Sequence, residues 1–378
     1  MHSEVLIIGG GVIGLSIARE LHLQGAERIT VLDKGSCGEE ASWAAAGMLS
    51  PQIEADMPDI FFDLCCASRD LYPEFADALL DETGVDIELE RTGTLYLGLD
   101  DDDILQMRAR HEWQSKAGLA VESLSSGELT RAEPCLSANV GEALFFPNDW
   151  QVENRKLTSA LMRYAWKNGI EVRENTRAGK IVIENRRAVG TRTNDGTAAA
   201  DFIIVATGAW TSFIQLGDAE MPTRVEPIRG QMIAFQPPER LFRHVLCGSR
   251  GYLVPRKDGR ILAGSTLENA GFDKTVSESA AAELHEMASE MTPAIRDMEF
   301  VDHWAGLRPH SSDEMPIMGA FAGIENLFLA TAHYRNGILL APLTAKLIAD
   351  KIVKGMDSSY LSAFSPDRFL RRTAGTSF

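Results

Sequence analysis

The sequence predicts an α/β protein in which a nucleotide-binding domain is assembled from several segments of the chain and a strand-rich α+β domain is inserted between them. Three observations carry this prediction. An apolar run enters a glycine-rich turn and a helical pattern at residues 5–24, a second apolar run ends at 206–208, and a third at 327–330 precedes a loop and a helix. The length of 378 residues exceeds what one compact core usually holds, which favours two domains.

The first segment has the pattern of a complete βαβ unit. The apolar strand Val5–Ile8 enters G-x-G-x-x-G, a helical pattern runs from Val12 to about Gln24, and the apolar run Ile29–Leu32 ends in Asp33. The glycines permit a tight turn, close approach of the backbone to a pyrophosphate, and close helix–strand packing, while the helix N-terminus attracts phosphate. Asp33 can accept hydrogen bonds from a ribose diol. The three glycines are Gly9, Gly11 and Gly14.

Periodicity and turn residues predict the remaining elements in chain order. The stretch Ala41–Met48 consists mostly of small residues and lacks the polar outer face of a surface helix, so we expect another part of the protein against its backbone. We expect these further elements: a helix over 61–82, strands at 87–89 and 94–97, helices at 101–116 and 155–168, a strand at 170–172, a hairpin turn at Asn194–Gly196, a strand at 202–205, one helix at 277–291 within the strand-rich section 225–301, a strand at 327–330 and a helix at 338–352.

Glycines at the ends of these elements predict where a ligand approaches. The strand at 202–205 opens onto Ala206–Gly208, and Gly337 stands at the start of the closing helix, whose N-terminus would point at a ligand. We therefore assign the nucleotide-binding domain to residues 1–85, 142–222 and 300–378. The inserted substrate domain, on a mostly antiparallel sheet, takes residues 86–141 and 223–299.

Composition limits the classes of partner. A formal net charge of −17 argues against nucleic acid and anionic membranes, both of which require a basic surface. The five cysteines form no C-x-x-C pair, which indicates reduced thiols and no metal site of that kind. The first apolar run is too short for a secretory segment, and no apolar stretch approaches the roughly 20 residues of a membrane span. We therefore expect a soluble cytoplasmic protein.

Seven stretches carry a resemblance to a known family. They are I-I-G-G-G-V-I-G (Ile7–Gly14), S-W-A-A-A-G-M-L (Ser42–Leu49), A-T-G-A-W (Ala206–Trp210), G-Y-L-V-P-R (Gly251–Arg256), G-R-I-L-A-G-S-T (Gly259–Thr266), W-A-G-L-R-P (Trp304–Pro309) and H-Y-R-N-G-I-L-L-A-P (His333–Pro342). In these the chain resembles the D-amino-acid oxidase family, and within it the bacterial glycine oxidases of thiamine thiazole synthesis. The first stretch occurs in many flavoproteins, whereas the last two together are much more specific.

The resemblance implies FAD as the cofactor. Covalent sarcosine oxidases attach flavin through a cysteine just after the stretch corresponding to Trp304–Gly306, and residues 307–312 contain none, so the resemblance implies non-covalent FAD. The negative charge of reduced flavin would be stabilised by the dipole of the helix after Gly337. The implied cofactor residues are Gly9, Gly11, Val12, Ile13, Gly14, Asp33 and Lys34 for the adenosine and pyrophosphate, Ala178 at the adenine, Ala41, Ser42, Ala46, Gly47 and Met48 on the flavin side, Ala206, Thr207 and Gly208 at the second strand end, and His333, Tyr334, Arg335, Asn336, Gly337, Ile338 and Leu339 around the isoalloxazine.

Three residues are the candidates for the chemistry. Arg308 would anchor the substrate carboxylate, because a planar guanidinium matches a carboxylate in bidentate fashion. Tyr252 would donate its hydroxyl to the same carboxylate; the alternative is a sheet tyrosine satisfied elsewhere. Arg335, through its carbonyl or side chain, would position the substrate amine, or it forms a salt bridge that braces its loop.

Other residues near the predicted site have weaker claims. His333 and His244 are histidines that can act as bases, but we expect neither to do so, because flavin oxidation of amines demands no side-chain base. Met48 and Leu267 are candidate apolar walls of the site, and the alternative for both is a place in the core.

The resemblance implies oxidative deamination of glycine, sarcosine and small D-amino acids by molecular oxygen. The products would be the 2-oxo acid, ammonia or an amine, and hydrogen peroxide, with the glycine imine passing to a thiazole synthase. The family commonly forms homotetramers. Two alternatives stay open: a D-amino-acid dehydrogenase that reduces a quinone or another acceptor, and a non-catalytic FAD-binding subunit or tRNA-modification domain.

Overall fold

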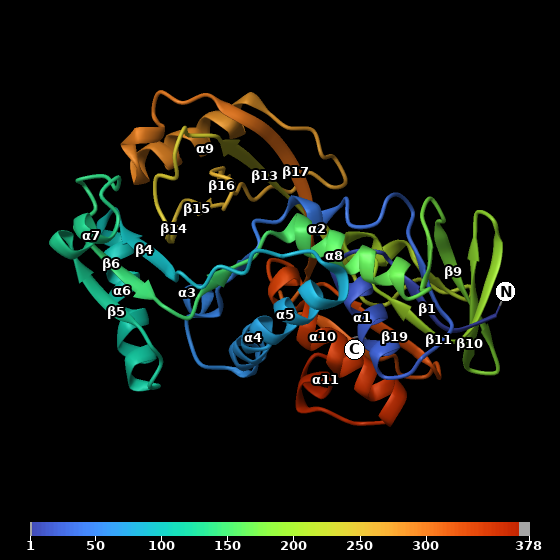
Figure 1. Cartoon of the computed structure of the whole chain (residues 1–378). Coiled ribbons are helices and arrows are strands. Elements are labelled where there is room, and N and C mark those ends of the chain that lie inside the picture. Colours follow the sequence, from blue (N-terminus) through green and yellow to red (C-terminus); the bar gives the residue numbers. More distant parts are fainter. Residues whose placement is uncertain (1, 370–378) are drawn as a thin grey trace, which may run out of the picture.

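The computed structural model describes residues 2–369 and has two large sheets with helices packed on and between them (Figure 1). The first sheet has the strand order β12-β9-β10-β11-β1-β2-β8, and β19 pairs with β11 and β18. Its strands are β1 (His2–Ile8), β2 (Ile29–Leu32), β8 (Glu171–Arg173), β9 (Ala178–Glu184), β10 (Arg187–Thr193), β11 (Gly196–Val205), β12 (Gln215–Leu216), β18 (Ile317–Ala320) and β19 (Leu327–Thr331).

The centre of the first sheet is parallel and buried on both faces. Strand β1 pairs in parallel with β11 and β2, and β11 pairs in parallel with β19. Alternate side chains of β1 enter different cores: Val5 and Ile7 pack with the helices, and Leu6 and Ile8 pack toward the β9–β10 side. Because parallel strands end at the same edge, the residues that follow β1, β11 and β19 meet there.

The second sheet is antiparallel except for the pair β14–β4, and its order is β17-β13-β16-β15-β14-β4-β6-β5. Its strands are β4 (Thr94–Gly98), β5 (Glu122–Ser125), β6 (Glu142–Phe146), β13 (Val225–Phe235), β14 (Val245–Gly248), β15 (Gly251–Pro255), β16 (Ile261–Gly264) and β17 (Phe300–Ser311). A short pair, β3 (Met48–Leu49) with β7 (Trp150–Gln151), lies apart from both sheets. The predicted α/β fold with a mostly antiparallel second sheet is confirmed.

The helices divide between the two sheets (Figure 1). The helix α1 packs against α10 and α8, whereas α9 packs against β13. They are α1 (Val12–Leu23), α2 (Ala41–Ala44), α3 (Pro51–Glu54), α4 (Ile60–Asp70), α5 (Tyr72–Thr83), α6 (Asp101–Lys116), α7 (Ser126–Ala132), α8 (Asn154–Lys167), α9 (Glu278–Met291), α10 (Gly337–Lys354), α11 (Ser359–Ala363) and the 3₁₀ turns η1 (Gly208–Phe213) and η2 (Pro293–Ile295). None of these helices is long and apolar enough to span a bilayer.

Two predicted elements were wrong. The helix expected over 61–82 is two helices, α4 and α5, that join at Leu71, and Pro73 stands in the first turn of α5, where a missing N–H costs nothing. The strand expected at 87–89 does not form. Glu88 has φ of +55°, which a strand cannot accommodate, so pairing there is limited to a bridge between Glu90 and Gln151.

Strand pairing bears on the predicted domain boundaries without deciding them. Strands β6 (from Glu142) and β17 (from Phe300) belong to the antiparallel sheet, although they begin where the segments of the nucleotide-binding domain were expected to resume. The division at residues 85, 141, 222 and 299 therefore stays a prediction.

A proline inside α10 is compensated by side chains of the helices α4 and α5. Pro342 has no N–H, so the carbonyl of Ile338 four residues earlier has no partner within the helix. The fully buried hydroxyl of Tyr72 donates to this carbonyl, and Ser68 donates to the carbonyl of Leu339 at 2.7 Å. These contacts hold the first turn of α10, which faces the candidate site.

Replacing Tyr72 by phenylalanine should lower the free energy of unfolding by about 1–3 kcal/mol, because the carbonyl of Ile338 is then buried without a partner. Thermal unfolding monitored by circular dichroism measures the change. The variant Tyr360→Phe on α11 is the control, and its melting temperature should stay near that of the parent protein. Equal melting temperatures for both variants would contradict the role given to Tyr72.

Candidate active site

A cavity of about 590 Å³ opens where β1, β11 and β19 end, and the second sheet closes it from the other side. Residues after the parallel strands line one part of it, including Gly9, Ala206 and Ala332. Strands β13, β15 and β17 contribute Met232, Tyr252 and Arg308. The cavity is therefore built from segments that lie more than 300 residues apart in the chain.

The glycines of the first turn allow the backbone packing that a dinucleotide site requires. A Cβ on Gly9, whose φ is +113°, would lie 2.3 Å from the carbonyl oxygen of Ala206. A Cβ on Gly14 would lie 1.9 Å from the carbonyl oxygen of Gly9, so α1 can pack against β1 only without a side chain there. Gly11 is the residue before α1 and has no side chain that could cap the helix. The hydroxyl oxygen of Ser42 instead accepts the N–H of Val12, the first residue of α1, at 2.9 Å.

Asp33 lies at the far end of the same cavity. Its carboxylate accepts the backbone N–H of Gly10 at 2.8 Å and of Gly35 at 2.9 Å. Burial raises the pKa of Asp33, and the two backbone hydrogen bonds oppose that rise. Each carboxylate oxygen keeps a free lone pair, so the group can still accept a hydroxyl from a ribose.

The other end of the cavity meets the N-terminus of α10. Asn336, the residue before the helix, makes no capping hydrogen bond with its side chain, so the first N–H groups of α10 are left for a ligand. Around Gly337 a Cβ would meet only the Cβ of His333, at 3.8 Å. The N–H of Tyr334 donates to the carbonyl of Pro309 at 3.1 Å, which places this loop beside Arg308.

Arg308 lines the part of the cavity that the second sheet closes. Its Nη2 donates to Oγ of Ser265 at 2.5 Å and its Nη1 to the carbonyl of Thr266 at 3.2 Å. Its guanidinium lies against Gly230, where a Cβ would come within 2.1–2.4 Å of it. Within residues 2–369 no carboxylate forms an ion pair with Arg308, so the side chain can take one from a ligand.

Tyr252 reaches the same part of the cavity from β15. Its ring lies against Gly264, and its hydroxyl is 3.9 Å from Sδ of Met232, a weak acceptor. Met48 and Met232 line the cavity, whereas Leu267 is 66% exposed and is not among the residues that line it. The expectation that Leu267 forms an apolar wall was therefore wrong, and Met232 takes that place.

The ionisable residues around the site have settled partners. Nη2 of Arg335 forms an ion pair with Glu54 at 3.1 Å, the bracing contact that was one of its two predicted roles. His333 is buried against Thr344, and burial lowers its pKa to about 3, so it stays neutral. His244 contacts Glu133 at 2.5 Å and lies outside the cavity.

The cavity brings together nearly all of the predicted site residues. Gly14 and Leu339 are the exceptions, since Gly14 packs α1 on β1 and Leu339 is in the core. The others line one cavity, and the role predicted for each of them stays a prediction. Residues that the sequence analysis did not assign also line the cavity: Glu40, Glu54, Arg177, Trp210, Phe213, Gly230, Met232 and Ser265. Trp210 and Ser265 lie within two of the sequence motifs that carry the family resemblance, and that position was the signal in the sequence that pointed to them.

The family described as FAD dependent oxidoreductase (DAO) matches residues 4–351. The chain belongs to this family. It is thus an FAD-dependent oxidoreductase, and the glycine turn and the uncapped N-terminus of α10 suit such a cofactor.

Members of the DAO family that resemble this chain include glycine oxidases. The chain is 37% identical over 357 residues to the glycine oxidase of Pseudomonas aeruginosa, covering 93% of this chain and 94% of that protein. It is 36% identical to the bifunctional protein ThiO/ThiG of Synechocystis, covering 98% of this chain but 55% of that protein. The crystal structure of glycine oxidase from Geobacillus kaustophilus superposes with a TM-score of 0.89 at 32% identity, over 97% of this chain and 99% of that one.

In this DAO family member a strap, which we define as residues 269–276, connects the second sheet to the end of the cavity at Asp33 and Lys34, where the adenosine is predicted to bind. Lys274 forms an ion pair with Glu40 at 2.9 Å, and Glu40 also binds Lys34 at 2.8 Å. Phe272 packs against Trp210 and Phe213, with ring centroids 5.7 and 5.1 Å apart. All of these partners of the strap line the cavity.

The double variant Lys274→Ala/Phe272→Ala, which removes the strap's contacts, should raise the Kd for FAD by up to about thirtyfold, chiefly by faster dissociation. The exposed ion pair and the aromatic pair contribute about 1 kcal/mol each, and 1.4 kcal/mol is a factor of ten. Flavin fluorescence measures both quantities. Lys257→Ala, which removes a comparable surface contact to Asp86, is the control. Unchanged FAD dissociation in the double variant would contradict this role.

A buried arginine network supports the cavity wall at Ala46, which is predicted to lie on the flavin side. Arg256 is 2% exposed and donates to the carbonyls of Val152 at 2.7 Å and Ala46 at 2.9 Å. It also donates to the side chain of Asn154, whose amide in turn holds the carbonyls of Ser42 and Trp43.

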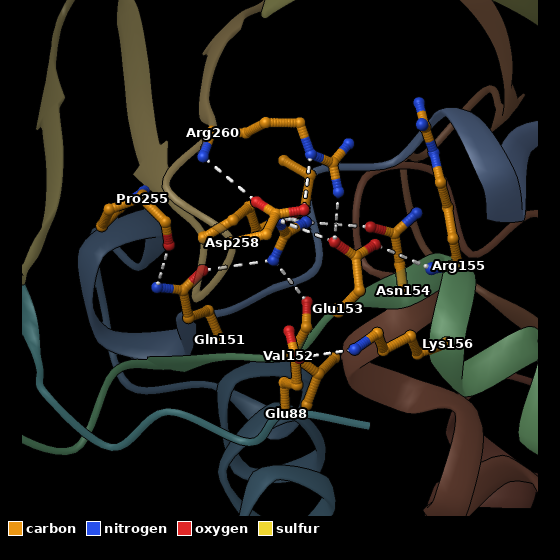
Figure 2. A network of polar contacts seen from close by, with 12 residues as sticks. Glu88, Gln151, Val152, Glu153, Asn154, Arg155, Lys156, Pro255, Asp258 and Arg260 are labelled. Carbon is orange, nitrogen blue, oxygen red and sulfur yellow. Dashed lines mark hydrogen bonds and ion pairs between the residues drawn. The ribbon is translucent and has the colours of Figure 1, made fainter. Parts of the chain in front are cut away.

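The wider network joins two parts of the chain. Figure 2 shows Gln151, Glu153 and Asn154 facing Pro255 and Arg260. Glu153 lies 3.4 Å from Nε of Arg256 and 3.3 Å from Nη2 of Arg260. The network thus fixes the small-residue segment 42–47 against the antiparallel sheet, as expected for a backbone with close neighbours.

Proposed function

We propose that the protein oxidises glycine and other small amino acids or amines, such as sarcosine and small D-amino acids, to the 2-oxo acid, ammonia or an amine, and hydrogen peroxide. The observation that carries the proposal is Arg308, a cation without an ion-pair partner among the described residues, beside Tyr252 at the end of the cavity. The resemblance to glycine oxidases of Pseudomonas aeruginosa and Geobacillus kaustophilus supports the choice of glycine.

The chain's own residues bind and orient the substrate. Arg308 and Tyr252 hold the carboxylate, and this anchor fixes the position of Cα within the cavity. Gly9–Gly14, Asp33 and the start of α10 would hold a non-covalent FAD, which would supply the redox chemistry with oxygen as the electron acceptor. His333 takes up no proton near neutral pH, because its pKa is lowered to about 3. His333 is therefore not the base that takes a proton from the substrate amine.

The role in thiamine biosynthesis is part of the same proposal. In the bifunctional protein ThiO/ThiG of Synechocystis, the region that this chain matches is joined to a further part of the polypeptide. This supports transfer of the glycine imine to a thiazole synthase. A cytoplasmic location and a homotetramer, which the resemblance implies, complete the proposal, and light scattering of the purified holoenzyme tests the second.

The first experiment is peroxide release by purified flavin-containing protein in air. Glycine, sarcosine, D-alanine and D-proline are offered separately, and we expect peroxide with glycine. Bleaching of the flavin without peroxide would replace the oxidase with a dehydrogenase that uses another electron acceptor. No bleaching with any of the four would overturn the proposed function.

A further inference from the structure

Ser265 follows β16 at the substrate end of the cavity and touches Arg308 directly. Its Oγ is 2.5 Å from Nη2 of Arg308, and the residue lines the cavity. Guanidinium nitrogens only donate hydrogen bonds, so the serine oxygen is the acceptor in this contact. The hydroxyl proton of Ser265 therefore takes no part in this contact, and no group within residues 2–369 accepts a hydrogen bond from it.

The backbone that carries Ser265 is held in place by its neighbour. The side chain of Thr266 accepts the N–H of Gln231 at 2.8 Å and donates to Glu268 at 2.5 Å. Glu268 is in turn paired with Arg229 at 2.5 Å. The orientation of the Ser265 hydroxyl toward Arg308 thus depends on a fixed segment and not on a free loop.

The same contacts fix the guanidinium. Arg308 lies on the backbone at Gly230 and has one N–H bound by Ser265 and another by the Thr266 carbonyl. Of the five N–H groups of an arginine, the remaining ones are available to a carboxylate. A carboxylate bound there would lie beside the unused hydroxyl proton of Ser265, and polarisation by the arginine makes that proton a better donor.

We propose that Ser265 is a specificity-determining residue: it orients Arg308 and donates its hydroxyl proton to the substrate carboxylate, so that the site takes amino acids in preference to amines without a carboxylate. The inference rests on the proposed function for the identity of the substrate. A charge-assisted hydrogen bond of this kind corresponds to roughly ten- to a hundredfold in affinity.

The test compares Ser265→Ala and Ser265→Thr holoenzymes with the parent protein. Acetate, a carboxylate without an amine, is titrated while the flavin absorbance is recorded, and KM and kcat for glycine are measured. In Ser265→Ala we expect the Kd for acetate and the KM for glycine to rise together by tenfold or more, with kcat within about twofold of the parent. In Ser265→Thr, which keeps the hydroxyl, both should return to within about threefold. Ser249→Ala, at an exposed serine of the same sheet, should change neither.

The outcomes separate this inference from the proposed function. Weaker acetate binding in Ser265→Ala supports the role of Ser265 even if the parent protein oxidises no amine, a result that would overturn the function alone. Acetate binding and KM unchanged in Ser265→Ala would overturn the inference while peroxide release with glycine sustains the function. A loss confined to kcat or to flavin content would also overturn it, because it would indicate a structural role.

Discussion

Replacing Arg308 by alanine is expected to lower kcat/KM for glycine by roughly two to three orders of magnitude, mainly through KM, while FAD stays bound. Truncating one partner of a hydrogen-bonded charge pair typically costs 2–5 kcal/mol, and each 1.4 kcal/mol is a factor of ten. The guanidinium contacts the cavity through the edge that Ser265 and Thr266 leave free. Steady-state kinetics with flavin content measured in parallel gives the result.

Two further variants make this test decisive. Arg308→Lys keeps the charge but not the planar pair of donors, so its kcat/KM should fall between those of the parent and the alanine variant. Arg250→Ala removes an exposed arginine of the same sheet that pairs with Glu286 and Glu290, and it should leave the kinetics unchanged. Activity of Arg308→Ala equal to that of the parent would show that the carboxylate binds elsewhere.

Arg256→Leu should lower the free energy of unfolding by about 3–5 kcal/mol, a large part of the roughly 5–15 kcal/mol typical of folded proteins. The leucine leaves the buried carbonyls of Val152 and Ala46 without their cationic donor and removes one of the two arginines that form ion pairs with Glu153. Chemical denaturation of the purified protein measures the loss. Because Ala46 lines the cavity, the Kd for FAD should rise in the same variant.

Arg260→Leu is the matched control, since Arg260 contacts the same carboxylate of Glu153 from a more exposed position. Its loss should cost less than about 1 kcal/mol, as is usual for surface ion pairs. If both leucine variants lost the same stability, the effect would belong to Glu153 and not to the buried network of Arg256.

Local patterns predicted much of the first sheet and its end of the cavity. The strand, turn and helix at residues 5–23 depend on residues that are close together in the sequence. The hairpin turn at Asn194–Gly196 likewise depends on its own residues, and the strands on either side of it pair from Thr193 and Gly196 onward. The helix that starts at Gly337 could be placed for the same reason. Gly9 and Gly14 mark close approaches of the backbone that a Cβ would block, and Gly196 has a φ of +126°, which residues with a side chain rarely adopt.

The contacts between distant segments could not be predicted, because no local period encodes them. Arg256 reaches back more than 200 residues to Ala46, and Lys274 reaches Glu40 over a similar separation. A salt bridge that braces the loop was one of two predicted roles for Arg335, but its partner was not predicted, because only the fold brings the carboxylate of Glu54 to the loop. Ser265 lies in the motif Gly259–Thr266, but the motif did not indicate a role for it, since a serine after a strand is ordinary until Arg308 is seen beside it.

A cavity that takes its walls from both sheets and from both ends of the chain has a consequence for the protein's abundance. Unfolding any of these wall segments destroys the FAD site, so the cofactor binds only the folded chain and adds RT ln(1 + [FAD]/Kd) to its stability. At a hundredfold excess over Kd that is about 2.7 kcal/mol. Cells short of flavin would then hold less of the protein, because more of it unfolds and is degraded, and riboflavin supply would set the enzyme's level as well as its activity.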